Sequence, residues 1–382
     1  TISFTYDGLN RLTKKDIPGT TINDVYYGYD LFGRTTSVRY GSPSGDGIIN
    51  SYDKAGRVIS TNAYGRSTAY QYDAGSRRTR LTHADGFFVQ YDYDVLDRVT
   101  KIRENGAASG VGVLASYAYD NEGRRANITY GNGVTSSFNY DSISRLSSLN
   151  HNLSGSSKDF TATFTYNPAS QLIDRDQSND GTYGYTGQAV GSESASFNGL
   201  NQVTSQGGNT ITHDANGNVT GDGASTYSYD VENKLTAVNG GTNVTFTYDP
   251  LSRLHQYVAG STTTQLLYDG LDIIAEYPAS GAVKRRYVHG PGVDEPLVWY
   301  EGSSTSDRRF LHADERGSIV AVTNSSGTSI ETRAYGPYGE PISFSGSKFQ
   351  YTGQYAIEEA GLYYYKARFY APHLGRFLQA DP

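Results

Sequence analysis

Two residue types, cysteine and methionine, are missing altogether from the 382-residue sequence. Without cysteine the chain has no disulfide, no reactive thiol and no cysteine-based metal site, which suits an oxidising exterior. The sequence starts at Thr1, inside a repeated motif, rather than at an initiating methionine. We therefore expect a fragment or processed product of a longer protein, in which any signal peptide lies upstream.

Charge and long apolar runs are also scarce. Charged residues make up 19% of the sequence and the net charge is −7, so there is no basic footprint and we expect no nucleic-acid partner. No apolar run approaches the roughly 18 residues of a membrane span, so we expect none in this chain. The sequence is rich instead in tyrosine (34 residues), phenylalanine (14) and glycine (44), a mixture that favours strands and turns over helices.

A short motif, Tyr-Asp-x-x-x-Arg, recurs along most of the chain. A ninth copy, at Tyr229, has Lys234 in place of the arginine. A short recurring period replaces the usual domain count with a repeat architecture. The eight exact copies are formed by Tyr6, Asp7 and Arg11; Tyr29, Asp30 and Arg34; Tyr52, Asp53 and Arg57; Tyr72, Asp73 and Arg77; Tyr93, Asp94 and Arg98; Tyr119, Asp120 and Arg124; Tyr140, Asp141 and Arg145; and Tyr248, Asp249 and Arg253.

Each copy has the sequence of a β-hairpin. Another aromatic residue usually precedes the tyrosine by two positions, which places both rings on one face of a strand. The aspartate and the next three residues have turn chemistry, because Asp, Asn, Ser and Gly bond their own backbone or tolerate positive φ. The arginine opens the return strand, where its side chain can meet the aspartate. We interpret this Asp/Arg pair as structural.

Four weaker copies continue the series at Tyr166, Phe197, His213 and Tyr268, which gives thirteen units, mostly 16 to 26 residues apart with one interval of 31. Residues 151–225 are looser and rich in small polar residues. Strand patterns at Thr210–Thr212 and Tyr227–Tyr229 indicate that the sheet continues there, and a flexible linker is the alternative. The sequence therefore predicts an all-β fold of repeated hairpins.

The motif resembles the YD repeat of the RHS/YD-repeat family, which includes bacterial RHS proteins, Tc toxin C components and teneurins. The resemblance implies that the hairpins join into one long sheet that spirals around a hollow interior, as a shell or barrel. It assigns residues 1–267 to YD repeats. Residues 268–382 resemble the RHS repeat-associated core domain, truncated at its C-terminal end. One departure is Gly336-Pro337-Tyr338-Gly339, where family members often carry Asp-Pro-aromatic-Gly.

The same resemblance raises the question of self-cleavage. Toxin-bearing relatives end the core domain in two Asp-Pro-x-Gly motifs, whose aspartates resemble an aspartic-protease pair that shares one proton. Asp381-Pro382 matches the start of the first motif, and the second aspartate is absent. We therefore expect Asp381 to be half of an autoprotease pair in the complete protein, with a structural turn acid as the alternative, and we expect the chain as given to be no enzyme.

Other chemical sites receive little support. The seven histidines are scattered, and His312-Ala313-Asp314 is interpreted as a strand-end hydrogen-bonding element. We expect no cofactor and no metal. The many tyrosines leave open a carbohydrate-binding reading in which cell-surface glycans stack on exposed rings.

We expect a structural shell, the C-terminal part of a larger RHS protein that encloses an effector or toxin released by self-cleavage. The alternatives are an extracellular or cell-surface structural protein without cargo, adhesive or filament-forming, and a carbohydrate-binding module. Expected partners are upstream repeats and a C-terminal domain of the same polypeptide, and copies of the chain along open sheet edges. The family resemblance implies a secreted or cell-surface location.

Overall fold

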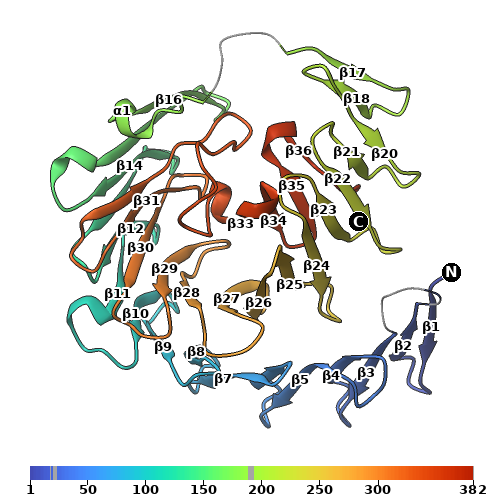
Figure 1. Ribbon diagram of the computed structural model, residues 1–382. Coiled ribbons are helices and arrows are strands. Elements are labelled where there is room, and N and C mark those ends of the chain that lie inside the picture. The colour runs from blue at the N-terminus through green and yellow to red at the C-terminus, as the bar shows by residue number, and fades with distance from the viewer. Residues whose placement is uncertain (18, 20–23, 188–192, 382) are drawn as a thin grey trace.

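The computed structural model describes residues 1–17, 19, 24–187 and 193–381. Within these residues the chain forms four antiparallel sheets, of 16, 3, 13 and 4 strands, in which consecutive strands are neighbours (Figure 1). The prediction of an all-β fold made of repeated hairpins is confirmed. In the described part of the chain no helix is long and apolar enough to cross a membrane.

The first sheet makes the outer wall, which runs in Figure 1 from the N-terminal end along the bottom and up the left side. Its strands are β1 (Ser3–Tyr6), β2 (Leu12–Asp16), β3 (Val25–Tyr29), β4 (Thr35–Tyr40), β5 (Gly47–Tyr52), β6 (Val58–Ala63), β7 (Arg66–Tyr72), β8 (Arg78–Thr82), β9 (Phe88–Tyr93), β10 (Val99–Glu104), β11 (Val113–Tyr119), β12 (Arg125–Tyr130), β13 (Thr135–Tyr140), β14 (Leu146–Asn152), β15 (Phe160–Tyr166) and β16 (Leu172–Gln177).

The 13-stranded sheet follows the same curve inside the first. Its strands are β20 (Thr212–His213), β21 (Val219–Gly221), β22 (Thr226–Tyr229), β23 (Leu235–Asn239), β24 (Val244–Tyr248), β25 (Leu254–Ala259), β26 (Thr262–Asp269), β27 (Asp272–Tyr277), β28 (Arg285–His289), β29 (Pro296–Glu301), β30 (Arg308–Ala313), β31 (Ile319–Thr323) and β32 (Ser329–Thr332). The boundary between residues 267 and 268 falls inside β26, so this sheet passes through it without a break.

Two small sheets and a few short helical turns complete the chain. The three-stranded sheet lies between the two long ones in sequence, and the four-stranded sheet belongs to the closing segment, residues 333–381. The elements are β17 (Ala195–Phe197), β18 (Val203–Gln206), β19 (Asn209–Thr210), β33 (Tyr355–Ile357), β34 (Leu362–Tyr365), β35 (Arg368–Ala371), β36 (Arg376–Phe377), α1 (Asp180–Tyr183), η1 (Gly110–Gly112), η2 (Ser156–Lys158), η3 (Tyr351–Gly353), η4 (Glu358–Ala360) and η5 (Pro372–Leu374).

The expected single long sheet is interrupted after β16. The prediction of a single strand at Thr210–Thr212 is wrong. Strand β19 ends at Thr210 in one sheet, and β20 starts at Thr212 in the next sheet. Ile211 lies buried between them. The predicted strand at Tyr227–Tyr229 is present within β22. The alternative prediction, a flexible linker within residues 151–225, includes residues 188–192, which lie outside the described residues.

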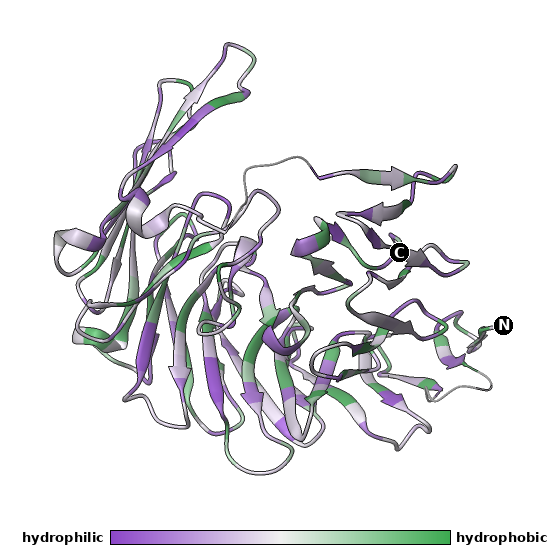
Figure 2. Ribbon diagram, turned by 45° about the horizontal axis from the view of Figure 1, so that its top comes forward, coloured by the Kyte–Doolittle hydropathy of each residue, from purple (hydrophilic) through white to green (hydrophobic). Residues whose placement is uncertain are grey.

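The inner sheet separates two hydrophobic cores, because alternate side chains of a strand point to opposite faces. Tyr287, Trp299 and Leu311 pack with Phe349 and Tyr355 of the closing segment. Their neighbours on the opposite face pack with Ile102, Leu114 and Ile128 of the outer wall: Val288, Val298, Tyr300 and Phe310. Figure 2 shows the hydrophobic positions as green bands that recur across neighbouring strands. The inner sheet is therefore covered on both faces.

A buried polar cluster also joins the two long sheets. Glu104, at the end of β10, accepts hydrogen bonds from the Arg308 guanidinium, with an Nε to Oε2 distance of 2.9 Å, and from the Tyr300 hydroxyl. All three residues are buried. Removing one member of such a cluster leaves a buried charge without its counter-charge.

The Glu104→Ala variant is therefore expected to lower the free energy of unfolding by about 3–5 kcal/mol. Glu122→Ala is the matched control, because Glu122 is a largely exposed acid that pairs with Arg124 at 2.9 Å, and its loss is expected to cost about 0–1 kcal/mol. Urea unfolding followed by tyrosine fluorescence measures both. Equal effects for the two variants would contradict the bridging role of Glu104.

Candidate functional site

The repeated turn has one geometry, which the Asp53–Arg57 copy illustrates. The Asp53 amide donates to the Arg57 carbonyl at 3.0 Å, and Asp53 Oδ1 accepts the amides of Ala55 at 2.9 Å and Arg57 at 3.0 Å. The residue before the arginine is left-handed, with φ of 85° at Gly56. This explains why Gly, Asn, Ser or Asp stands there in every copy.

The predicted contact between the aspartate and the arginine is present in all eight exact copies. In each copy the arginine Nε donates to the aspartate Oδ2 over 2.5–2.8 Å. One carboxylate oxygen thus binds the turn backbone while the other binds the guanidinium. The pair fixes the direction in which the arginine leaves the turn.

Each arginine then reaches the following repeat. Arg57 Nη1 donates to the Asp73 carbonyl at 3.1 Å, and its guanidinium lies 4.8 Å from the centre of the Tyr72 ring. The Tyr72 hydroxyl donates back to the Val58 carbonyl at 2.8 Å. We call this set of contacts the inter-repeat clamp. It explains why tyrosine, aspartate and arginine recur together.

The clamp recurs along both long sheets. Eight guanidinium groups lie 4.3–5.0 Å from the centre of the next tyrosine ring. The hydroxyl-to-carbonyl bond spans 2.7–3.0 Å at Tyr29, Tyr52, Tyr72, Tyr93, Tyr119, Tyr140, Tyr166, Tyr248 and Tyr268. A ring with a guanidinium on its face is not a free stacking platform for a sugar.

Two turns of the same type went unrecognised in the sequence. Asp314 Oδ1 accepts the amides of Arg316 at 3.0 Å and Ser318 at 2.8 Å, and Asn324 Oδ1 accepts those of Ser326 and Thr328. Both turns have an Asp or Asn followed three residues later by glycine, a pattern that could have predicted them. They lack the tyrosine and the arginine of the Tyr-Asp-x-x-x-Arg motif. This type of turn therefore also occurs within residues 268–382.

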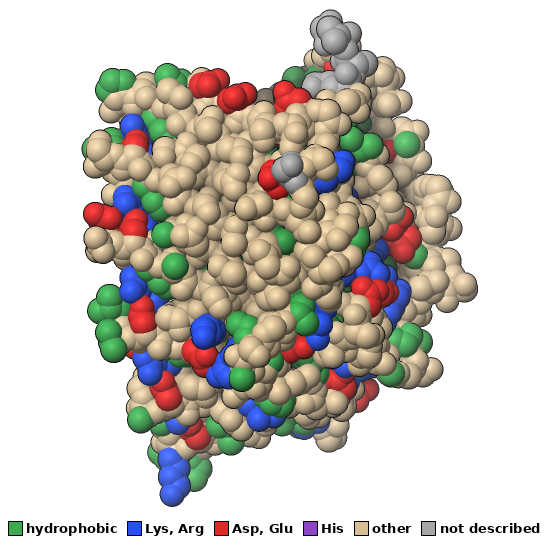
Figure 3. Space-filling view, turned by 90° about the vertical axis from the view of Figure 1, so that its left-hand side faces the viewer, with side chains coloured by type: hydrophobic (Ala, Val, Ile, Leu, Met, Phe, Trp, Pro, Cys, Tyr) green, Lys and Arg blue, Asp and Glu red, His purple; other side chains and the backbone are tan. Residues whose placement is uncertain are grey.

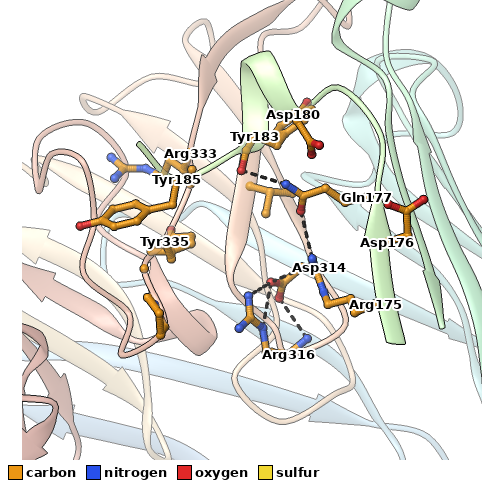
Figure 4. A pocket seen from close by; sticks show the side chains of 14 residues that line it. Arg175, Asp176, Gln177, Asp180, Tyr183, Tyr185, Asp314, Arg316, Arg333 and Tyr335 are labelled. Atoms are coloured by element: carbon orange, nitrogen blue, oxygen red, sulfur yellow. Dashed lines mark hydrogen bonds and ion pairs between the residues drawn. The ribbon is translucent and has the colours of Figure 1, made fainter. Parts of the chain in front are cut away.

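A polar hollow of about 470 Å³ lies beside the Asp314 turn (Figure 4). Asp314 is buried there and pairs with Arg316 Nη2 at 2.9 Å, and burial raises the pKa of the Asp314 carboxyl. Arg175 donates to Glu315 at 2.7 Å and to Gln177 at 3.0 Å. The carboxylate of Asp314 is therefore paired, as expected for a strand-end hydrogen-bonding element.

Charged side chains pair in this way over the surface as well. Figure 3 shows lysine and arginine lying beside aspartate and glutamate, rather than in a patch of one sign. Among the described residues no group of three or more His, Cys, Asp or Glu side chains is placed to hold a metal ion.

Asp381 lies at the end of the closing segment. Its side chain is 84% exposed and one carboxylate oxygen lies 3.1 Å from Arg368 Nη1. The preceding residues are fixed, because the Leu378 carbonyl accepts the Val219 amide at 2.8 Å and the Ala380 amide donates to Asn218 Oδ1. Pro382, the other half of the Asp-Pro pair, lies outside the described residues. The Asp381 side chain is thus exposed to solvent, while the backbone before it is fixed.

The clamp predicts a loss of stability in acid. Hydrogen bonds from the backbone amides of the paired arginines hold the pKa of Asp7, Asp53 and Asp141 below the ordinary value. An unfolded aspartate has a pKa of about 3.9, so the clamps contribute fully above that pH and lose their contribution as pH falls through the lower folded pKa. The melting temperature, followed by circular dichroism, should therefore fall steeply below about pH 4.

Buried histidines should add a separate, earlier decline. Burial lowers the pKa of His83 and His151 to about 4. Because an unfolded histidine has a pKa of about 6.5, stability should fall between about pH 6.5 and pH 4. His151→Gln should reduce this decline and leave the fall below pH 4 unchanged. A melting temperature that is constant from pH 7 to pH 3 would contradict both assignments.

Comparison with solved structures and known sequences identifies the architecture. The structure titled TcdB2-TccC3 matches with a TM-score of 0.72 and 15% sequence identity, over 100% of this chain and 26% of that chain. At that identity the likeness shows the fold, an all-β spiral of hairpins.

Two curated proteins share local sequence. The tRNA3(Ser)-specific nuclease WapA of Bacillus spizizenii is 32% identical over 200 residues, which are 49% of this chain and 8% of the nuclease. Salivary gland surface protein 1 of Aedes aegypti is 44% identical over 112 residues, 25% of this chain and 3% of that protein. The chain thus spans a small part of the relatives it matches.

Two family profiles match the chain itself. The RHS repeat matches residues 52–87, and the teneurin YD-shell matches residues 124–382, well over half of the sequence. The clamp turns lie in both matched regions. The chain belongs to the teneurin YD-shell family, whose repeats are those of RHS proteins.

Proposed function

We propose that this chain forms the wall and the closing segment of a shell that encloses a C-terminal effector in the full-length protein. The observation that carries the proposal is the layering. The closing segment lies against the concave side of the inner sheet, through Phe349 and Tyr355, and the outer wall covers the opposite side. Figure 1 shows this segment, in red, within the curve of the wall.

The lengths of the relatives support the proposal. The chain covers 8% of the WapA protein, whose name describes a nuclease specific for a serine tRNA. Most of that protein therefore lies outside the matched region, which leaves room for further wall repeats and for an enclosed effector on the same polypeptide. We place the protein outside the cell or on its surface, because one relative is named as a gland surface protein.

Self-cleavage is the proposed release step. Asp381 supplies one carboxylate, and the second comes from a downstream Asp-Pro-x-Gly motif of the complete protein. The anchored stretch from Leu378 to Ala380 holds Asp381 at a fixed place beside β21. The chain alone, with one member of the pair, is inactive in this proposal.

The test uses the complete native polypeptide. Intact mass and C-terminal sequencing by mass spectrometry should find one cut just beyond the second motif, with the released piece still co-eluting with the shell. Asp381→Asn should abolish the cut. Asp307→Asn is the control, since Asp307 is a surface acid that pairs with Arg309 at 2.7 Å and should leave the cut intact.

A second function is a surface structural protein without cargo. The likeness to a protein named for a gland surface favours it. A continuous polypeptide with no retained fragment would contradict the container and support this reading.

A further inference from the structure

The Tyr229 repeat, with lysine for arginine, has a different side-chain arrangement on the same backbone. Asp230 Oδ1 accepts the amides of Glu232 at 2.7 Å and Lys234 at 3.0 Å, and Asn233 has φ of 59°, as in the other copies. Lys234 Nζ, however, donates to Glu232 at 2.8 Å. Within the described part of the chain, Asp230 Oδ2 has no hydrogen bond or ion pair.

The next ring along the sheet is also less covered. The Lys234 ammonium lies 5.6 Å from the centre of the Tyr248 ring, whereas each guanidinium of the eight arginine clamps lies within 4.3–5.0 Å of its ring. An ammonium is also a compact point charge, without the planar group that stacks on a ring face. The Tyr248 ring therefore has an ammonium beside it and no guanidinium stacked on its face.

A cavity of about 440 Å³ lies at this place, between the outer wall and the inner sheet. The outer wall contributes Tyr40 and Tyr64, and the inner sheet contributes Tyr248 and His255. His255 stacks on Tyr64, with ring centres 3.9 Å apart and an angle of 20° between the planes. All four side chains are partly exposed, so solvent reaches the cavity. Its size and aromatic lining are those of a small-molecule site.

The polar groups of the cavity decide what it can hold. Asp230 and Asp46 carry negative charge, and the positive charge of Lys234 is already paired with Glu232, so a free anion finds no matching field. Burial raises the pKa of the Asp230 carboxyl and lowers that of the Lys234 ammonium. Both groups gain from neutral hydroxyl partners. Hydroxyls donate to a carboxylate and accept from an ammonium, and the apolar face of a sugar ring packs on aromatic rings.

We propose that this cavity is a binding site for a neutral saccharide, with Asp230 and Lys234 hydrogen-bonded to its hydroxyls and the tyrosines packed against its ring. Asp381 is not among the residues that line the site. It gives the wall a ligand of its own, at the repeat in which lysine replaces the arginine of the clamp.

The direct test restores the clamp. Because the turn backbone is unchanged, the guanidinium of Lys234→Arg should occupy Asp230 Oδ2 and cover the Tyr248 ring, which closes the site without harming the fold. Saturation-transfer NMR on the purified chain uses maltose, lactose, N-acetylglucosamine and diacetylchitobiose as probes, with choline chloride and sodium sulfate as charged probes. At least one saccharide should bind. Its affinity should fall by at least about tenfold in Lys234→Arg.

Two further variants separate the site from general stability. Tyr64→Ala removes one of the aromatic side chains that line the cavity and should weaken the binding of the same saccharide. Arg98→Lys makes the opposite exchange at a repeat outside the cavity and should leave binding unchanged. Thermal unfolding should show Lys234→Arg to be at least as stable as the parent. The proposal is overturned if no saccharide binds, if Lys234→Arg binds as well as the parent, or if choline or sulfate binds more tightly than every saccharide.

Discussion

The rest of the structure depends on the hydrogen bond between an aspartate in one turn and the arginine that closes it. An isolated hairpin is marginal in water and needs neighbours. The aspartate orders its own turn through one oxygen and aims the arginine through the other. The arginine then covers the ring of the next hairpin and, as Arg57 does, can also bind its carbonyl. Each repeat therefore positions the following one. A chain with few charges and no disulfides obtains a long regular wall in this way.

Ion pairs at the hairpin turns also join the two long sheets to each other. The turns of the inner sheet lie near side chains of the outer wall, as in the pairs of Arg125 with Glu295 and of Arg175 with Glu315. Together with the Glu104 cluster, these contacts join residues that are 140 to 204 positions apart. The layering that encloses the closing segment thus depends on ion pairs between sheets as well as on the two hydrophobic cores.

The sequence predicted the hairpins because their causes are local. Asp53 and Gly56 determine the turn, and the alternation of aromatic residues determines the strand. The reach of Arg57 to the Asp73 carbonyl could not be predicted, since it depends on how two hairpins stack. The break at Ile211 was missed for a similar reason, because a buried isoleucine favours a strand and says nothing of which sheet it joins. The Asp314 turn was recoverable from the glycine three residues later.

The directional order of the clamp is the central claim, and hydrogen–deuterium exchange on Arg57→Ala tests it most directly. The loss of the guanidinium should release the amides of its own turn, at Ala55 and Arg57, and those of the following turn at Asp73 and Arg77. The preceding turn at Asp30 and Arg34 should keep its protection, because Arg34 still holds the Asp53 carbonyl. A loss of amide protection confined to residues 53–57, or an equal loss of protection in the preceding and the following turn, would contradict the account.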